Sequence, residues 1–558
     1  MKRSSPVLKL IITICCLLLL GAILSMFYLN SLLIDSPVSF SPVVEKLLIP
    51  KKLNDSTYTV GNNYLQRIDS GMYVLYLEGD ALERGNALGA LTSDLHRQQE
   101  LAFISQIKKM IPSPFYLKFL KYFIAYFTRD IEKYIPKEYL EEIYAESRYM
   151  SSDFDATIGP AYMRILNYHA AHDIGHALQD RHFVTGCTSF AAWGTYTTDN
   201  KLIIGRNFDF YVGDDFAKNK IICFMKPSTG IPFAMVTWPG MIGAVSGLNK
   251  SGITVTINAA KSSLPLEAKT PVSIVAREIL QYASSLSEAI SIARKRQMFV
   301  SESILVGSAS ENKAIIIEKS PDSLGVYSAD SSLLICSNHF QSSTFSRDSN
   351  NIKFRDESSS DYRFLRMQQL IASQSIIDPL HTAGILRNPY GMDNEKIGWG
   401  NEKAIDQLIA HHSVIMKPAT GDFWVSTHPY QLGKYLHFNM TGLFQSGTNP
   451  YQPSLNIPAD TFLLHQAYLP YMKFKKLAQW VEEEMKSKKL IVSDSLSRLI
   501  HLNPDYYRSY EIAGDYFTVQ NSFDKAKENY MISLQKVIPT LGDKDRILMK
   551  IQNLQHKK

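Results

Sequence analysis

The sequence predicts an α+β fold in which β-sheets pack on each other and are covered by helices. From Gly186 onward, short runs rich in β-branched and aromatic residues alternate with turn signals such as Lys250-Ser251-Gly252, a pattern typical of an antiparallel sheet. Helical patterns, with apolar residues three and four apart, occur from Leu101 to about Leu178 and again after these runs. Elements that occur in such blocks form layers around a shared core.

The size and composition are those of a globular protein with more than one structural unit. The chain has 558 residues, 45% hydrophobic and 20% charged, which suggests about three units with a sizeable core. The formal net charge of +6 is small for this length, and the charges form no block of one sign. The sequence therefore gives no support to nucleic-acid binding.

The N-terminus predicts a membrane anchor. Lys2, Arg3 and Lys9 precede an uncharged, strongly apolar run from Leu10 to Ile34. That run is long enough to cross a bilayer as a helix. We interpret residues 1–34 as a cytoplasmic tip and a signal anchor, with the rest of the chain on the extracytoplasmic side of the cytoplasmic membrane; a cleaved signal peptide is the alternative.

Residues 35–58 are rich in Ser, Pro and Lys and are predicted to be a linker. Residues 59–186 form a predicted helical region that opens with a short alternating strand and three glycines, Gly79, Gly85 and Gly89. These glycines could cradle an anion, but the sequence around them lacks a phosphate-loop motif. A tight turn and close helix packing are the preferred explanation.

A group of histidines closes this helical region. His169, His172, Asp173 and His176 lie close together, and at helical spacing His172 and His176 would share a face, as metal ligands do. The sequence shows neither an H-E-x-x-H glutamate nor an obvious third ligand. Core or capping histidines are therefore preferred, and the prediction includes no metal and no cofactor.

Residues 187–458 are predicted to form the central core. Strands are expected at 187–198, 201–212, 220–228, 232–240 and 252–260, then at 303–310, 313–320 and 332–340, with a last pair at 412–418 and 422–428. Helices are expected at 270–285, 285–297 and 361–374, and a polar, Ser-rich loop at 341–359.

Residues 459–558 are predicted to form a C-terminal α-helical extension. The spacing of its large, small and aromatic residues matches one tetratricopeptide repeat, at Tyr510, Gly514, Phe517, Ala526, Tyr530 and Ser533. A single repeat is too short for an independent solenoid. The sequence is therefore consistent with two roles for this region, a cap on the core or a surface that binds a protein partner.

Cys187 is the candidate nucleophile. It follows Gly186 and begins a predicted strand, although a free cysteine in a strand is more often a small buried apolar residue. Cys223 and Cys336 lie within apolar strands and are expected to be inert. The odd, sparse set of cysteines argues against a disulfide framework.

Five later residues favour a catalytic role for Cys187. A hairpin would bring Arg206 and Asp209 back beside it. Asn258 and Asn338 each end a strand with an amide that can donate to a developing oxyanion, and Arg363 can supply a further fixed charge. Each has a structural alternative: a cross-strand ion pair for the first two, strand-end turns for the asparagines, and a solvated helix position for Arg363.

In this order and local context, these residues resemble the penicillin acyltransferase family of N-terminal-nucleophile amidohydrolases, which is related to choloylglycine hydrolases and acid ceramidases. The resemblance rests on Gly186-Cys187-Thr188, on Gly205-Arg206-Asn207-x-Asp209, and on Asn258, Asn338 and Arg363. It extends from about Tyr73 to Phe438. It does not cover the membrane segment or the C-terminal helices.

The resemblance implies a four-layer αββα sandwich that matures by cutting itself between Gly186 and Cys187. The new α-amine of Cys187, with a reference pKa of about 7.7 to 8, can then act as the base for its own thiol. Asn258 and Asn338 would hold the oxyanion, and Asp209 with Arg206 would position the amine and thiolate.

The function expected from the sequence is that of a membrane-tethered cysteine acyltransferase or linear-amide hydrolase. Its substrate would be a small or lipid-like acyl amide or thioester with a hydrophobic acyl group. One alternative is a lipid-ester or ceramide-type hydrolase using the same nucleophile. The other is an inactive membrane-anchored scaffold that binds partners through its tetratricopeptide-like end.

Overall fold

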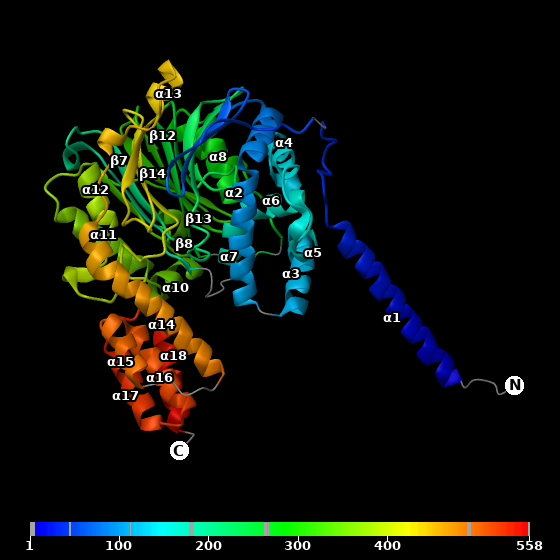
Figure 1. Cartoon of the computed structure of the whole chain (residues 1–558), viewed down its shortest axis with the longest axis vertical. Coiled ribbons are helices and arrows are strands. Elements are labelled where there is room, and N and C mark those ends of the chain that lie inside the picture. The colour runs from blue at the N-terminus through cyan, green and yellow to red at the C-terminus, as the bar shows by residue number, and fades with distance from the viewer. Residues whose placement is uncertain are drawn as a thin grey trace.

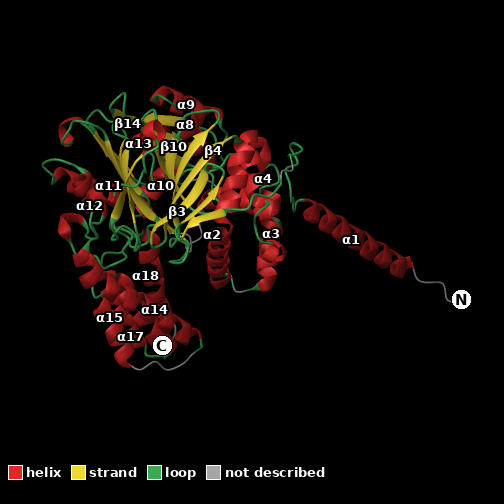
Figure 2. Ribbon diagram, turned by 45° about the horizontal axis from the view of Figure 1, so that its top comes forward, coloured by secondary structure: helices red, strands yellow, loops and turns green. Residues whose placement is uncertain are grey.

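The computed structural model describes residues 6–43, 46–111, 113–177, 184–261, 265, 267–487 and 493–555. It has the mixed α/β architecture that the sequence predicts, with β-sheets at the centre and helices on the outside (Figures 1 and 2). A long N-terminal helix and a C-terminal group of helices project from this body (Figure 1).

The larger sheet has eleven strands in the order β1-β2-β3-β4-β9-β10-β11-β12-β13-β14-β15. All neighbours pair antiparallel except β4 and β9, which are parallel. The strands are β1 (Lys51–Asn54), β2 (Thr57–Val60), β3 (Asn63–Asp69), β4 (Met72–Gly79), β9 (Lys220–Pro227), β10 (Phe233–Thr237), β11 (Ser246–Asn249), β12 (Ile253–Ala259), β13 (Glu302–Ser308), β14 (Lys313–Lys319) and β15 (Leu324–Tyr327).

The smaller sheet has six antiparallel strands in the order β16-β6-β7-β17-β18-β19. A separate pair, β5 and β8, joins the residues before Gly186 to those after Asp209. These strands are β5 (Val184–Thr185), β6 (Thr188–Ala192), β7 (Ile203–Phe208), β8 (Phe210–Tyr211), β16 (Leu333–Cys336), β17 (His412–Lys417), β18 (Asp422–Ser426) and β19 (Tyr435–Asn439).

One apolar cluster joins the two sheets face to face. It contains Val74 and Ile222 from the large sheet and Ile204 and Val414 from the small one. Strands that are apolar on both faces become buried on both sides, so each sheet also needs a cover of helices. The mixed strand and helix blocks of the sequence follow from this requirement.

Helices cover the outer face of each sheet. The large sheet packs against α2 (Ala81–Met110), α4 (Lys137–Ser147), α6 (Ala161–His169), α8 (Val272–Tyr282) and α9 (Leu286–Lys295). The small sheet packs against α11 (Ser360–Ala372) and α12 (Pro379–Leu386). Further helices are α3 (Pro114–Phe127), α5 (Asp155–Ile158), α7 (Ala171–Ala177), α10 (Ser349–Glu357) and α13 (Met440–Ser446).

The glycines that open α2 serve helix packing, as preferred from the sequence. Asp80 and Glu83 form a capping box at the start of the helix, which satisfies two of its free backbone donors. A Cβ at Gly85 would lie 2.3 Å from the carbonyl oxygen of Glu142 in α4, and one at Gly89 would lie 2.5 Å from the ring of Tyr149. Side chains at either position would push the two helices apart.

The predicted linker at 35–58 ends in strands, which corrects its interpretation. β1 and the start of β2 form a hairpin at the edge of the large sheet. All of β1 is exposed, so its sequence has the polar character of a linker. Before it, α1 (Pro6–Ser31) is long and apolar enough to span a bilayer, a property that signal sequences near an N-terminus share.

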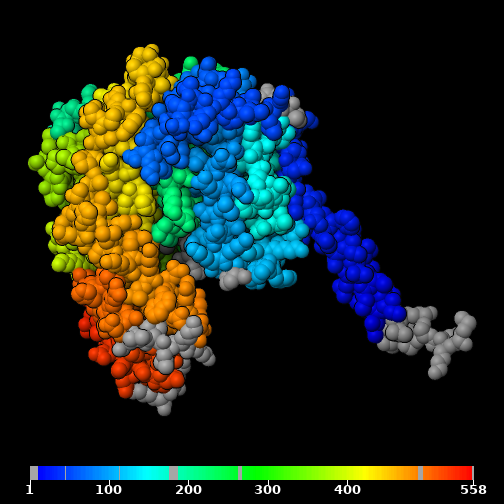
Figure 3. Space-filling view, viewed as in Figure 1, coloured from blue at the N-terminus to red at the C-terminus, as the bar shows by residue number. Residues whose placement is uncertain are grey.

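The C-terminal helices form a lobe beside the core (orange to red in Figure 3). They are α14 (Leu469–Lys486), α15 (Ser493–Leu502), α16 (Tyr507–Val519), α17 (Phe523–Leu534) and α18 (Leu541–Gln555). Their apolar cluster includes Leu408 and Tyr430 of the preceding region. Helices α16 and α17 meet closely, because a Cβ at Gly514 would lie 2.4 Å from the ring of Tyr530. The likeness to a tetratricopeptide repeat stays a prediction.

Candidate active site

The β6–β7 hairpin brings Arg206 beside Cys187. Cys187 immediately precedes β6, and Ser189 of β6 pairs with Arg206 of β7. Both side chains are fully buried, and Nη2 of Arg206 lies 3.8 Å from Sγ of Cys187. The predicted contact between the candidate nucleophile and this arginine is therefore present.

The carbonyl oxygen of Gly186 accepts hydrogen bonds from two side chains. Nη1 of Arg363 donates to it at 2.8 Å and Nε2 of Gln407 at 2.6 Å. The Gly186 amide donates to the carbonyl oxygen of Asp209 at 3.0 Å. Gly186 is thus held at both its amide and its carbonyl, with a positive charge and an amide donor on the carbonyl of the Gly186–Cys187 bond.

A side chain at Gly186 would displace the end of the Gln407 side chain. A Cβ there would lie 2.4 Å from Oε1 and 2.6 Å from Nε2 of Gln407. The close approach of Gln407 to the carbonyl therefore depends on glycine at this position.

Arg363 links four parts of the site. It lies on α11, and its Nη1 also donates to the Cys187 carbonyl oxygen at 2.8 Å and to Oγ1 of Thr188 at 2.6 Å. Its Nη2 donates to Oδ1 of Asn338 at 2.8 Å. The side chain is only 3% exposed. The solvated position that the sequence left open for Arg363 is therefore excluded.

The side-chain amides of Asn258 and Asn338 donate hydrogen bonds to main-chain carbonyl oxygens. Nδ2 of Asn258 donates to the carbonyl oxygens of Cys336 and Ser337, both at 3.2 Å. Nδ2 of Asn338 donates to the Ala259 carbonyl oxygen at 2.8 Å. With the Gly186–Cys187 bond intact, the donors on the Gly186 carbonyl are Arg363 and Gln407.

Burial sets the ionisation of the site. It raises the pKa of the Cys187 thiol to about 11, against the lowering effect of Arg206. It raises the pKa of Asp209 to about 7, opposed by Arg363 and Arg206, and lowers the pKa of Arg363 to about 10. Near neutrality, the thiol is therefore protonated while Asp209 is close to its midpoint.

A buried polar chain fixes Arg206. Its Nη1 donates to Oγ of Ser246 at 2.6 Å, and its Nη2 donates to the Ile257 carbonyl oxygen at 2.6 Å. Oγ of Ser246 lies 3.0 Å from Nε2 of His412. The guanidinium also lies 4.2 Å from the centre of the Phe208 ring. Sequence reasoning missed Ser246 and His412, which come from different strands.

Gln407 is another residue that the sequence did not indicate. It lies between Ala404 and Leu408, in a stretch without a regular element. Nε2 of Gln407 also approaches Oδ2 of Asp209 at 3.4 Å. Periodicity gives no signal in such a loop. The residues around Gln407 also match no known motif.

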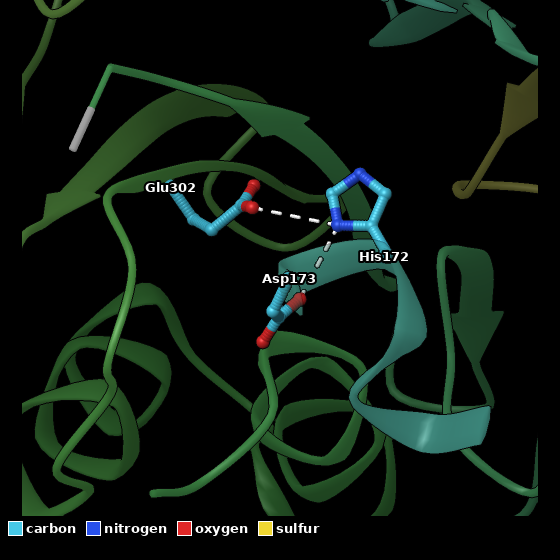
Figure 4. Close-up of side chains that lie close together, drawn as sticks. All are labelled: His172, Asp173 and Glu302. Atoms are coloured by element: carbon cyan, nitrogen blue, oxygen red, sulfur yellow. Dashed lines mark hydrogen bonds and ion pairs between the residues drawn. The ribbon is translucent and has the colours of Figure 1, made fainter. Parts of the chain in front are cut away.

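The histidine group separates into two environments. His169 is a core histidine, as preferred from the sequence: its Nδ1 lies 2.8 Å from the Ile165 carbonyl oxygen, and its Nε2 accepts from the Ile242 amide. His172 and Asp173 instead meet Glu302, a residue distant in sequence (Figure 4). The side chain of His176 lies outside the described residues.

Two apolar cavities lie next to this region and share Phe103, Tyr168, Ala171 and Phe210. The larger, of about 190 Å³, is enclosed by α2, α3, α6 and α7, with Phe210 following Asp209 directly. The smaller, of about 30 Å³, is lined by His172 and Trp238 among others. Their link to the catalytic candidates is Phe210, the residue after Asp209, which lines both cavities.

The remaining core thiols are buried. Cys223 and Cys336 are at most 1% exposed, and burial raises the pKa of each well above its ordinary value. No arginine within hydrogen-bond reach of either thiol is seen in the described part of the chain. This is the environment of an unreactive cysteine.

Comparisons with known proteins agree with the motifs. Residues 196–376 match the family model described as acyl-coenzyme A:6-aminopenicillanic acid acyl-transferase. The matched segment begins after Cys187 and includes Arg206, Asp209, Asn258, Asn338 and Arg363.

Two named relatives align with 39% and 51% of this chain. The N-acylethanolamine-hydrolyzing acid amidase of Caenorhabditis elegans is 25% identical over 235 residues, covering 39% of this chain and 59% of the relative. Protein dcd1B of Dictyostelium discoideum is 23% identical over 303 residues, covering 51% and 56%. The chain spans about half the length of the curated relatives it matches.

Among solved structures, the Caenorhabditis elegans N-acylethanolamine-hydrolyzing acid amidase ortholog matches with 17% identity and a TM-score of 0.32, over 42% of this chain and 93% of that one. Penicillin V acylase from Agrobacterium tumefaciens matches with 12% identity and a TM-score of 0.31, over 47% and 89%.

Proposed function

We propose that this chain, which matches the acyl-coenzyme A:6-aminopenicillanic acid acyl-transferase family model over residues 196–376, is a self-cleaving cysteine amidohydrolase or acyltransferase of the N-terminal-nucleophile class. The observation that carries the proposal is the Gly186 carbonyl, which is held by Arg363 and Gln407 next to the buried Cys187 thiol. The two apposed sheets with helices outside support the four-layer αββα form of this fold.

Maturation begins with attack of the Cys187 sulfur on the Gly186 carbonyl carbon. The thiol proton leaves to a base, and the carbonyl oxygen becomes an oxyanion that Arg363 and Gln407 are placed to stabilise. The C–N bond between Gly186 and Cys187 then breaks, and the amine takes up a proton. Water hydrolyses the resulting thioester, which leaves a carboxylate on Gly186 and a free thiol and amine on Cys187.

Turnover uses the same atoms on an external acyl group. The liberated amine, with a reference pKa of about 7.7 to 8, accepts the thiol proton. Arg206 holds the sulfur, and the charge of Asp209 acts on the Cys187 thiol. Asn338 orients Arg363, while Asn258 fixes the backbone at Cys336 and Ser337. The acyl-enzyme then passes to water or to an amine.

The apolar cavities support the proposal that the acyl group of the substrate is hydrophobic. The larger one, of about 190 Å³, is lined mainly by aliphatic and aromatic residues and reaches Phe210, next to Asp209. Apolar walls with a few polar groups are typical of ligand sites. We expect the substrates to be amides or thioesters that carry a hydrophobic acyl group.

The N-terminal helix supports a location at a membrane. Helix α1 leaves the body and is exposed along its apolar length (Figure 3). It contacts the body near α3, where Oη of Tyr122 donates to Oδ1 of Asn30 at 2.9 Å. The basic residues before it favour a cytoplasmic N-terminus, which would place the catalytic core on the extracytoplasmic side.

The experiment compares the unaltered protein with Cys187→Ala and Cys223→Ala on acyl amides, esters and thioesters of increasing chain length. The unaltered protein and Cys223→Ala should hydrolyse one class, with amides or thioesters ahead of esters, and Cys187→Ala should have no activity above background. A preference for esters would favour the lipid-ester alternative. Activity retained by Cys187→Ala would refute the assignment of the nucleophile.

A further inference from the structure

We propose that His172, Asp173 and Glu302 form a binding site for one divalent transition-metal cation of the zinc class, beside the catalytic centre. The two residues on α7 meet the first residue of β13 in the interior of the molecule (Figure 4). The side chains are at most 4% exposed.

Two of the three separations between ligand atoms fit the edges of a tetrahedral site, and all three ligand atoms lie within 4.8 Å of one another. Nδ1 of His172 lies 3.2 Å from Oδ1 of Asp173 and 3.5 Å from Oε1 of Glu302. Zinc–nitrogen and zinc–oxygen bonds of about 2.0 to 2.1 Å in a tetrahedron separate neighbouring ligand atoms by about 3.3 Å. One ring nitrogen thus faces two carboxylates at separations close to those that a shared cation requires.

Glu302 points to a ligand independently of this spacing. Its side chain is fully buried, and neither carboxylate oxygen has a hydrogen-bond partner among the residues that the structure describes. Figure 4 shows one of these oxygens aimed at His172. A buried carboxylate normally binds a donor, a counter-charge or a metal. A cation between Asp173 and Glu302 would supply positive charge to two buried carboxylates that face one imidazole.

The surrounding residues hold Asp173 in place. Its Oδ2 accepts from the amide of Val272, the first residue of α8, at 2.9 Å, which leaves Oδ1 facing His172. The cavity of about 30 Å³ lined by His172 has room for a water, since a site needs about 10 to 15 Å³ for one. Three protein ligands leave a fourth position for such a water.

The ligand set selects the class of cation. An imidazole nitrogen with two carboxylates suits zinc and its neighbours, whereas calcium and magnesium favour sites made of oxygen ligands. The cation would tie α7 to β13. If the Gly186–Cys187 bond is cut as proposed above, these elements belong to different fragments, so the cation would bridge them.

The test uses the full chain in detergent, without a histidine tag, as Cys187→Ala, so that the result does not depend on cleavage or activity. After removal of metal with dipicolinate, zinc or cobalt is added back. We expect about one equivalent of zinc per chain by elemental analysis, with visible absorption from bound cobalt typical of tetrahedral coordination. We also expect a melting temperature that falls on chelation and recovers with zinc but not with calcium.

Glu302→Gln in this background should weaken cobalt binding by ~100-fold or more, because loss of a second-shell partner already costs about 10- to 100-fold and Glu302 is a proposed ligand. Glu146→Gln is the matched control, because Glu146 is also a fully buried carboxylate but lies against the Gly240 backbone and not beside His172, and this variant should bind cobalt as before. If Glu302→Gln does not fold, the chelation result on the parent protein decides. No bound zinc and an unchanged melting temperature would overturn the proposal, as would cobalt binding retained by a folded Glu302→Gln.

Discussion

Two buried polar centres in the described part of this protein, at the Gly186 carbonyl and at His172, have opposite character. Around the Gly186 carbonyl, donors converge on one acceptor: Arg363 and Gln407 both point at the same oxygen. Around His172, acceptors converge instead, since the carboxylates of Asp173 and Glu302 face one ring nitrogen. A donor-rich centre stabilises a developing negative charge, whereas an acceptor-rich centre stabilises a cation. The two centres are therefore suited to different chemistry within one core.

Arg363→Met should cause the largest change at the donor-rich centre. It removes the charged donor from the Gly186 and Cys187 carbonyl oxygens and from Thr188. Loss of an oxyanion donor costs about 10²- to 10³-fold in rate, and we expect self-cleavage to slow by about 10³-fold. Cleavage of freshly translated protein, followed on denaturing gels, measures this.

The matched control is Arg366→Met on the same helix. Arg366 is also buried, but it donates to Asn388 and Asn394 instead of the cleavage site. The Arg366→Met variant should therefore cleave itself at nearly the rate of the unaltered protein. Equal slowing in both folded variants would show that Arg363 acts only through the stability of α11.

The pH dependence of cleavage should reflect Asp209. Burial raises its pKa to about 7, while the Cys187 thiol titrates near 11. Only the ionised carboxylate can accept the thiol proton, directly or through one water. The rate should therefore fall about tenfold per pH unit below 7 and level off above it.

Asp209→Asn should remove this inflection and leave a slow rate that rises with pH toward the thiol pKa. The measurement is the self-cleavage rate of both proteins between about pH 5 and 9. A flat profile in the unaltered protein, or an unchanged inflection in Asp209→Asn, would contradict the assignment.

The smallest expected effect is a change in acyl-chain preference when the apolar cavities beside His172 are narrowed. Ala171 lines both cavities, so Ala171→Leu should shorten the longest acyl chain that is accepted. We expect kcat/KM to fall about tenfold for the longest good substrate and little for short ones, as the loss of space for one or two methylenes implies. The self-cleavage rate of the same variant is the internal control. An unchanged chain-length profile would place the acyl group elsewhere.

The sequence predicts the parts of the site that are encoded locally. The alternating and apolar runs locate β6, β7 and β12, and with them Cys187, Arg206 and Asn258. The helix pattern locates α11 and Arg363. Exposed edge strands such as β1 were missed because they lack an apolar face, and α10, within the predicted loop at 341–359, because its sequence is polar.

Two residues of the centres have no local signal. Gln407 reaches the Gly186 carbonyl from a stretch without periodicity. Glu302 meets His172 only because β13 and α7 pack together in the fold. Pairings across such distances in sequence arise from tertiary structure and leave no trace in spacing.

The most direct test of the account is the identity of the new N-terminus. The purified unaltered protein should separate on a denaturing gel into two fragments. N-terminal sequencing and intact mass of the larger one should show that it begins with Cys187, and the mass of the other should show that it ends with Gly186. An uncut chain after prolonged incubation, or a cut at any other bond, would contradict the proposal that Cys187 becomes an N-terminal nucleophile.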